Sequence, residues 1–187
     1  DRQWVTYPDY NDRASWDRFL GTFKDEYIRR GEKRLNYQWQ VVKATDYLAF
    51  ERTGNRQIME KPFGANNGAI ADLLMAELAE GKGRFVDQLI NGVFNACEMT
   101  SWALAAHIIV QPSHRALPAY DYPVIDLTSG DLGGLLAWTY HFMRPSFDKV
   151  DPEISRRLRH ELQTRILDPY MNNDSFWWMG RNYNGRM

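Results

Sequence analysis

Residues 84–98, with the sequence RFVDQLINGVFNACE, place apolar side chains on two sides of a helix. The apolar positions recur every three to four residues, the spacing that puts side chains on one helical face. One stripe consists of Phe85, Leu89, Val93 and Cys97, and the other of Val86, Ile90 and Phe94. A helix with two apolar faces needs two neighbours to cover it. The segment therefore predicts serial helical hairpins, as in a solenoid or toroid, and not a simple bundle with one stripe per helix.

Helical spacing extends over most of the chain, and no alternating strand pattern of useful length occurs. We expect Gly31 to stop the first helix, because glycine is common just after a helix end. A loop is expected over residues 111–123, which contain three prolines. The other expected helices span residues 15–31, 36–52, 67–80 and 101–110. Two more are expected, one capped by Asp126 or Ser129 that ends at Arg144-Pro145, and one capped by Asp151, with Pro152 at its first position, that ends at Asp168-Pro169. The predicted class is all-α, with antiparallel helical hairpins forming part of an (α/α) toroid.

Composition excludes several classes of protein. The 187 residues contain 23 basic and 24 acidic side chains, so electrostatic capture of nucleic acid or of an anionic membrane is not expected. The longest apolar stretch, Trp102 to Val110, is interrupted by His107 and is too short to span a bilayer. A single cysteine, Cys97, excludes an internal disulfide and a cysteine-rich zinc site. The 14% of aromatic residues predicts a large core, an aromatic-lined groove, or both.

No cofactor is expected from the motifs. The four histidines never occur three or four residues apart, which is the spacing that places two metal ligands on one helical face. Gly81-Lys82-Gly83 lacks the further glycine and the preceding strand of a nucleotide-binding loop, so it is interpreted as a turn. Three carboxylates, Asp121, Asp126 and Asp131, lie near the start of one expected helix, and helix capping accounts for the last two.

Aromatic residues and an arginine near the end of the chain suggest sugar binding. Trp177, Trp178 and Arg181 combine flat apolar faces with a forked cationic donor, as an acidic sugar requires. The alternative is that the tryptophans belong to the core. His107 is a weaker candidate, because a histidine in the segment WALAAHII is either a hydrogen-bonded core residue or a residue that faces a cleft. The aromatic stretch at residues 175–183 would be costly to leave in water, so we expect this chain to be a fragment.

Several segments, in this order and spacing, resemble the heparinase II/III-like polysaccharide lyases. They are WALAAH (102–107), DYPVIDLTS (121–129), LLAWTY (135–140), RRLRHEL (156–162), ILDPYM (166–171) and FWWMG (176–180). The resemblance implies an N-terminal (α/α) toroid, a C-terminal β-sandwich region, and cleavage of uronic-acid-containing glycans by β-elimination. It also implies an acidic polysaccharide partner and a periplasmic or secreted location in a bacterium.

In this family a base removes the C5 proton, donors stabilise the carboxylate-derived enolate, and an acid protonates the leaving oxygen. The resemblance implies an Asn-Trp-Asn-like motif for the carboxylate just after the FWWMG segment, where this chain has NYNG (182–185). The later Tyr and His segments and the β region are missing. No catalytic residue is therefore assigned, and the chain alone is expected to be inactive.

Two other functions stay open at this point. An (α/α) glycoside hydrolase would need two carboxylates across a cleft, and Asp121 and Asp126 are the candidates. A non-catalytic helical module could instead bind a glycan or a protein. We also expect self-association, because a truncated toroid would leave an apolar helix face uncovered.

Overall fold

The computed structural model describes residues 6–173 and 176–179. Within these ranges the chain forms helices and loops and contains no strand, which confirms the all-α class. The helices are α1 (Arg13–Leu20), α2 (Lys24–Glu32), α3 (Ala44–Thr53), α4 (Gln57–Glu80), α5 (Val86–Cys97), α6 (Ala105–Ile108), α7 (Leu127–Val150), α8 (Pro152–Leu162) and α9 (Asp168–Met171). A 3₁₀ turn, Gly21–Phe23, joins α1 to α2, and another spans Trp177–Met179.

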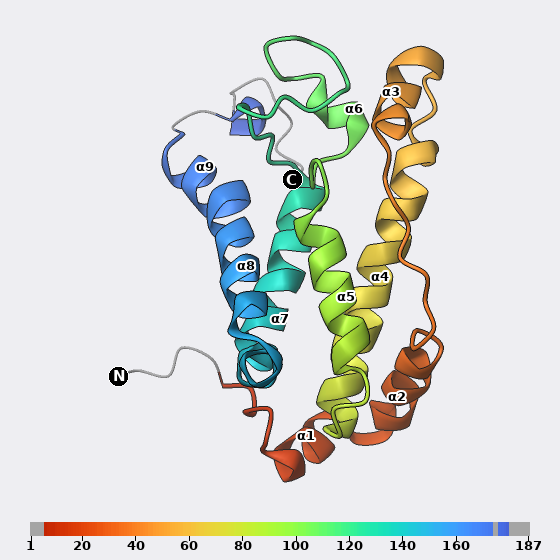
Figure 1. Ribbon diagram of the computed structural model, residues 1–187, viewed down its shortest axis with the longest axis vertical. Helices are drawn as coiled ribbons and strands as arrows, with labels where there is room; N and C mark the ends of the chain where they lie inside the picture. The colour runs from red at the N-terminus through yellow and green to blue at the C-terminus, as the bar shows by residue number, and fades with distance from the viewer. Residues whose placement is uncertain (1–5, 174–175, 180–187) are drawn as a thin grey trace.

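Two helices of 24 residues, α4 and α7, run in the same direction and begin at the same end of the molecule (Figure 1). Helix α5 returns antiparallel to α4, and α8 returns antiparallel to α7 (Figure 1). Helix α6 and the loop of residues 109–126 lie at the end where α4 and α7 begin (Figure 1). This end therefore collects two helix N-termini, each at the positive end of its helix dipole, and that of α7 is capped by Asp126.

The two-sided pattern of residues 84–98 has the expected consequence for packing. Helix α5 contacts α4, α7 and α8, so it has neighbours on more than one side. Leu89, Val93 and Cys97 are completely buried, whereas Ile90 and Phe94 are partly buried against the same core. The burial of these stripes fixes α5 between its hairpin partner α4 and the second hairpin, α7 with α8.

The helical segment does end near Gly31, at Glu32, but Gly31 is not the residue that stops it. Gly31 is a buried residue inside α2, at the point where this helix crosses α4. A Cβ atom at this position would overlap the Cβ of Ala76 and would lie 3.1 Å from the ring of Phe85. Glycine is needed here for close helix packing, and the expected single helix over 15–31 is instead α1, a 3₁₀ turn and α2.

The expected helix over residues 36–52 begins late, at Ala44. The preceding segment is irregular because the buried side chain of Asn66 on α4 supplies its hydrogen bonds. Asn66 Oδ1 accepts from Tyr37 Oη and from the backbone N–H of Gln40, both at 3.0 Å. Asn66 Nδ2 donates to the Gln40 carbonyl at 2.7 Å and to Asn95 Oδ1 at 3.0 Å. A side chain distant in the sequence thus replaces the expected turn of helix.

Proline did not end the helices where the sequence predicted. Helix α7 continues through Pro145 to Val150, because buried Met143 and Phe147 hold both sides of the proline in the core. After α8 the chain forms a π-helical turn, Gln163–Leu167, and α9 then begins at Asp168. Pro169 lies in the first turn of α9, where a missing N–H is tolerated.

Two further boundaries differ from expectation. Helix α4 begins at Gln57, ten residues before the predicted start, with Pro62 inside its N-terminal part. The expected helix over 101–110 shrinks to α6, because the backbone N–H groups of Ala103 and Leu104 bond to the side chains of Ser101 and Asp126. The predicted N-caps Asp126 of α7 and Asp151 of α8 are confirmed, as is the loop at 111–123.

Candidate functional site

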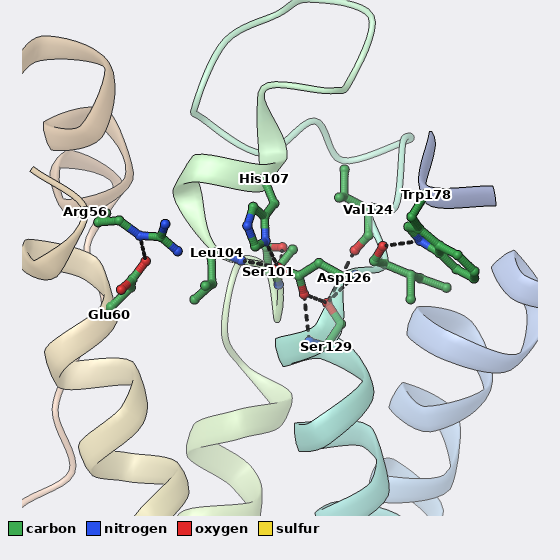
Figure 2. A network of polar contacts seen from close by, with 11 residues as sticks. Arg56, Glu60, Ser101, Leu104, His107, Val124, Asp126, Ser129 and Trp178 are labelled. Atoms are coloured by element: carbon green, nitrogen blue, oxygen red, sulfur yellow. Dashed lines mark hydrogen bonds and ion pairs between the residues drawn. The ribbon is translucent and has the colours of Figure 1, made fainter. Parts of the chain in front are cut away.

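Asp126 joins the start of α7 to the segment that leads into α6. Its carboxylate is buried and accepts four hydrogen bonds (Figure 2). Oδ1 accepts from the backbone N–H and from Oγ of Ser129, both at 2.8 Å. Oδ2 lies 3.0 Å from the Leu104 nitrogen and 2.6 Å from Nδ1 of His107. One side chain therefore fixes the positions of a helix N-terminus, a backbone segment and an imidazole.

Electrostatics keep this carboxylate ionised at neutral pH. Burial alone would raise the pKa of Asp126, but the hydrogen bonds from His107, Ser129 and Leu104 outweigh it and lower the pKa below its usual value. The N-terminus of α7 adds a favourable dipole. Because an ionised carboxylate only accepts hydrogen bonds, we assign the proton of the contact to Nδ1 of His107.

His107 is hydrogen-bonded, as the first alternative from the sequence expected, and whether it faces a cleft stays a prediction. Of its side chain, 27% remains exposed at the end where α4 and α7 begin. Asp126 orients the ring from the Nδ1 side, which is how a carboxylate fixes the tautomer and direction of a functional imidazole. His107 is thus a fixed, partly exposed ring and not a fully buried core residue.

Trp178 lies beside the same backbone segment. Its indole Nε1 donates to the carbonyl of Ile125 at 3.1 Å. Its ring stacks on Phe176 with centroids 5.1 Å apart, and Phe176 stacks on Tyr170 at 5.9 Å. In Figure 2, Trp178 and His107 lie on opposite sides of Val124 and Asp126. These two sequence-predicted site residues thus contact neighbouring residues of one segment, Asp126 and Ile125, from opposite sides.

The other two predicted residues are not described by the structure. Trp177 lies in the turn Trp177–Met179, but its side chain is outside the described residues. Arg181 also lies outside them. Their assignment to a sugar-binding cleft stays a prediction.

A cleft of about 430 Å³ opens between the loop before α7 and the end of α8. Its aromatic lining consists of Trp102, Tyr120 and Tyr122, and Asp121, Glu161 and Arg165 are its charged lining residues. Tyr120, Tyr122 and Arg165 were not among the site residues predicted from the sequence. The sequence feature that could have pointed to Tyr120 and Tyr122 is their place in a short loop between Pro118 and Pro123, because functional side chains are frequently held on loops.

Ion pairs on α8 make one wall of this cleft rigid. Glu161 lies between two arginines, with Arg157 Nε at 2.8 Å and Arg165 Nε at 2.6 Å. Burial acts to raise the pKa of Glu161, but the two arginines lower it. Arg165 also donates to the Cys97 carbonyl at 3.0 Å and lies over the ring of Trp102, 5.2 Å from its centroid. These contacts fasten the π-helical turn after α8 to the C-terminal end of α5.

The carboxylates do not favour a glycosidase. Asp126 is nearly inaccessible, and both of its oxygens are used by donors of the chain itself. Asp131 is exposed on the first turns of α7, as expected for a residue near a helix N-terminus. The pair Asp121 and Asp126 would therefore lack a second accessible carboxylate for acid–base work.

Comparison with protein-family models gives no match to this sequence, and comparison with curated proteins gives none either. Among the described residues, no group of three or more His, Cys, Asp and Glu side chains is arranged to hold a metal ion. None of the helices in the described ranges has the length and apolar character needed to cross a membrane.

Proposed function

We propose that this chain is part of the helical domain of a polysaccharide lyase, which cleaves uronic-acid-containing glycans of the heparin/heparan or a related acidic class by β-elimination. The observation that supports the proposal best is the convergence of His107 and Trp178 on the backbone around Asp126. These residues were selected from the sequence as sugar-binding candidates, and they come from distant parts of the chain.

The arrangement of the helices is compatible with part of an (α/α) toroid. In such a domain successive antiparallel hairpins form two layers, and the ends of the inner helices surround a cleft. Here α4 and α5, and then α7 and α8, form successive antiparallel pairs. We propose that α4 and α7 belong to the inner layer, with the cleft at their N-terminal ends.

The electrostatic character of this end suits a substrate with carboxylate groups. The N-terminus of α4 can attract an anion, whereas that of α7 is already capped by the ionised Asp126, which also holds the imidazole of His107 in place. Because Nδ1 holds the proton shared with Asp126, Nε2 of this fixed ring can accept a hydrogen bond from a glycan hydroxyl without first losing rotational freedom. We propose a substrate-positioning role for His107 and place proton abstraction on residues outside this chain. A periplasmic or secreted location in a bacterium is part of the same proposal.

The product of the full-length protein tests this function. We expect incubation with heparan sulfate, hyaluronan or alginate to release unsaturated uronate, which absorbs in the ultraviolet, from at least one of these glycans. New reducing ends without ultraviolet absorbance would identify a hydrolase. Binding of these glycans without any turnover would identify a non-catalytic binding module. Either of these two results would refute the lyase proposal.

A further inference from the structure

We propose that residues 109–125, named here the tyrosine loop, form a sugar subsite in which Tyr120 and Tyr122 bind an uncharged ring of the glycan and exclude a uronate. The inference rests on the proposed function for its class of substrate, a glycan that contains uronic acids. It goes further by assigning a subsite and its specificity to residues of the cleft beside α8.

Exposed aromatic surface is the first argument. Tyr120 is fully exposed and 44% of Tyr122 is exposed, although both are large aromatic residues in one short loop. Both line the cleft of about 430 Å³, a size in the range of small-ligand sites. A tyrosine offers a flat apolar face for the C–H groups of a sugar ring and a hydroxyl for its polar edge. Exposed aromatic side chains gathered at a cleft are typical of binding surfaces.

The second argument is that the loop is held in shape before any ligand arrives. Gln111 is buried at its base, and its Nε2 donates to the carbonyls of Arg115 and Leu117, both at 2.8 Å. Its Oε1 accepts from the backbone N–H of Ala119 at 2.9 Å. The residue directly before Tyr120 is therefore fixed by a hydrogen bond. An ordered loop loses less conformational entropy when it binds a ligand.

A second anchor ties the tyrosine loop to α3. Glu51 on α3 accepts from Arg115 Nε at 2.7 Å and from the backbone N–H of Ala116 at 3.0 Å. Gln111 and Glu51 together bind backbone groups of the loop at residues 115, 116, 117 and 119. The two tyrosines are thus displayed by a supported loop, as expected of a binding loop on a rigid scaffold.

Charge determines which ring fits. The charged residues that line the cleft are Asp121, Glu161 and Arg165, and the last two form an ion pair. Asp121 lies in the chain between the two tyrosines, so its carboxylate adds negative charge to the same wall. A uronate ring would bring a second carboxylate into this wall and would be repelled. An uncharged ring, such as an N-acetylated hexosamine, would instead offer hydroxyl and amide donors to Asp121.

The test compares two glycans with the whole 187-residue chain. Hyaluronan alternates a uronate with an uncharged N-acetylated sugar, whereas alginate consists only of uronates. We expect the chain to bind hyaluronan oligosaccharides more tightly than alginate oligosaccharides of equal length in calorimetric titrations. Tyr120→Ala should weaken hyaluronan binding by roughly tenfold, the order expected for the loss of one aromatic contact. Tyr120→Phe should bind nearly as well as the wild type, because it keeps the ring face.

Two further variants separate the subsite from general effects. Phe23→Ala removes another exposed aromatic side chain, 67% exposed, from the opposite end of the molecule and should leave binding unchanged (Figure 1). Asp121→Asn should raise the affinity for alginate, because it removes the repelling charge. Thermal unfolding of each variant checks that the fold is retained.

The inference is overturned if the chain binds neither glycan, if alginate binds as tightly as hyaluronan, or if Tyr120→Ala binds like the wild type. These results would leave the lyase proposal in place, since that proposal is judged by the unsaturated product of the full-length protein. Conversely, the chain could show the expected binding pattern while the full-length protein releases no unsaturated product. That result would refute the lyase proposal and leave the sugar subsite in place.

Discussion

Replacing Asp126 with alanine should lower the free energy of unfolding by about 3 kcal/mol, far more than an ordinary helix cap is worth. Loss of the N-cap of α7 accounts for about 1 kcal/mol. The variant also leaves the N–H groups of Leu104 and His107 without their acceptor, at about 1 kcal/mol or more each. Because His107 is partly exposed, water can replace part of its lost hydrogen bond, so we count about 1 kcal/mol for each of these two N–H groups.

Asp151 provides a matched control, because it caps α8 at an exposed site. Its side chain accepts a capping hydrogen bond from the backbone N–H of Glu153 at 2.9 Å. Asp151→Ala should therefore cost only about 1 kcal/mol. Urea unfolding followed by circular dichroism at pH 7 measures both variants. Equal losses for Asp126→Ala and Asp151→Ala would refute the argument that Asp126 joins α7 to α6.

The same carboxylate predicts a dependence on pH. The pKa of Asp126 is lower in the folded chain than in the unfolded chain. At a pH between the folded and the unfolded pKa, Asp126 is therefore protonated more often in the unfolded chain than in the folded chain. The stabilisation is therefore fully present above the unfolded pKa of about 3.9 and is lost as the pH falls through the folded value. Unfolding curves of the wild type and Asp126→Asn should differ at pH 7 and converge in acid. A difference that stays constant down to pH 2 would contradict this assignment.

Three shorter predictions concern packing, binding and assembly. Gly31→Ala should destabilise the chain by about 1–3 kcal/mol in urea unfolding, because the new Cβ would overlap Ala76. A Cβ at Gly68 meets no atom within 4 Å, so Gly68→Ala should be neutral or stabilising. Equal effects of the two substitutions would contradict the close packing of α2 on α4. Arg181→Ala in the full-length protein should raise KM for an acidic glycan with little effect on folding, and unchanged kinetics would count against its place in the cleft. An apolar groove lies between α1, α4 and α7, lined by residues that include Phe19, Leu74 and Trp138, and the Phe19 side chain is 57% exposed. This groove should support self-association in light scattering that Phe19→Asp abolishes, and a wild-type monomer at high concentration would exclude it.

Much of the helical fold was predictable because its causes are local. A 3.6-residue apolar period identifies a helix whatever its neighbours are, and the two stripes of residues 84–98 already required two partners for α5. Asp126 and Asp151 were recognisable as N-caps because a cap bonds to a backbone group only two or three residues away. His107 and Trp178 were selected as candidates by residue type and neighbours alone.

The tertiary structure decided what depends on residues distant in the sequence. Asn66 holds residues 37–40 out of a helix, and the close approach of α4 keeps Gly31 helical where a stop was expected. The partner of His107 and the place of the tyrosine loop were equally hidden, since nothing in the local sequence shows that Asp126 receives bonds from both Leu104 and His107. Short-range periodicity and capping are encoded within a few residues, whereas hydrogen bonds and packing between remote segments exist only once the helices have assembled.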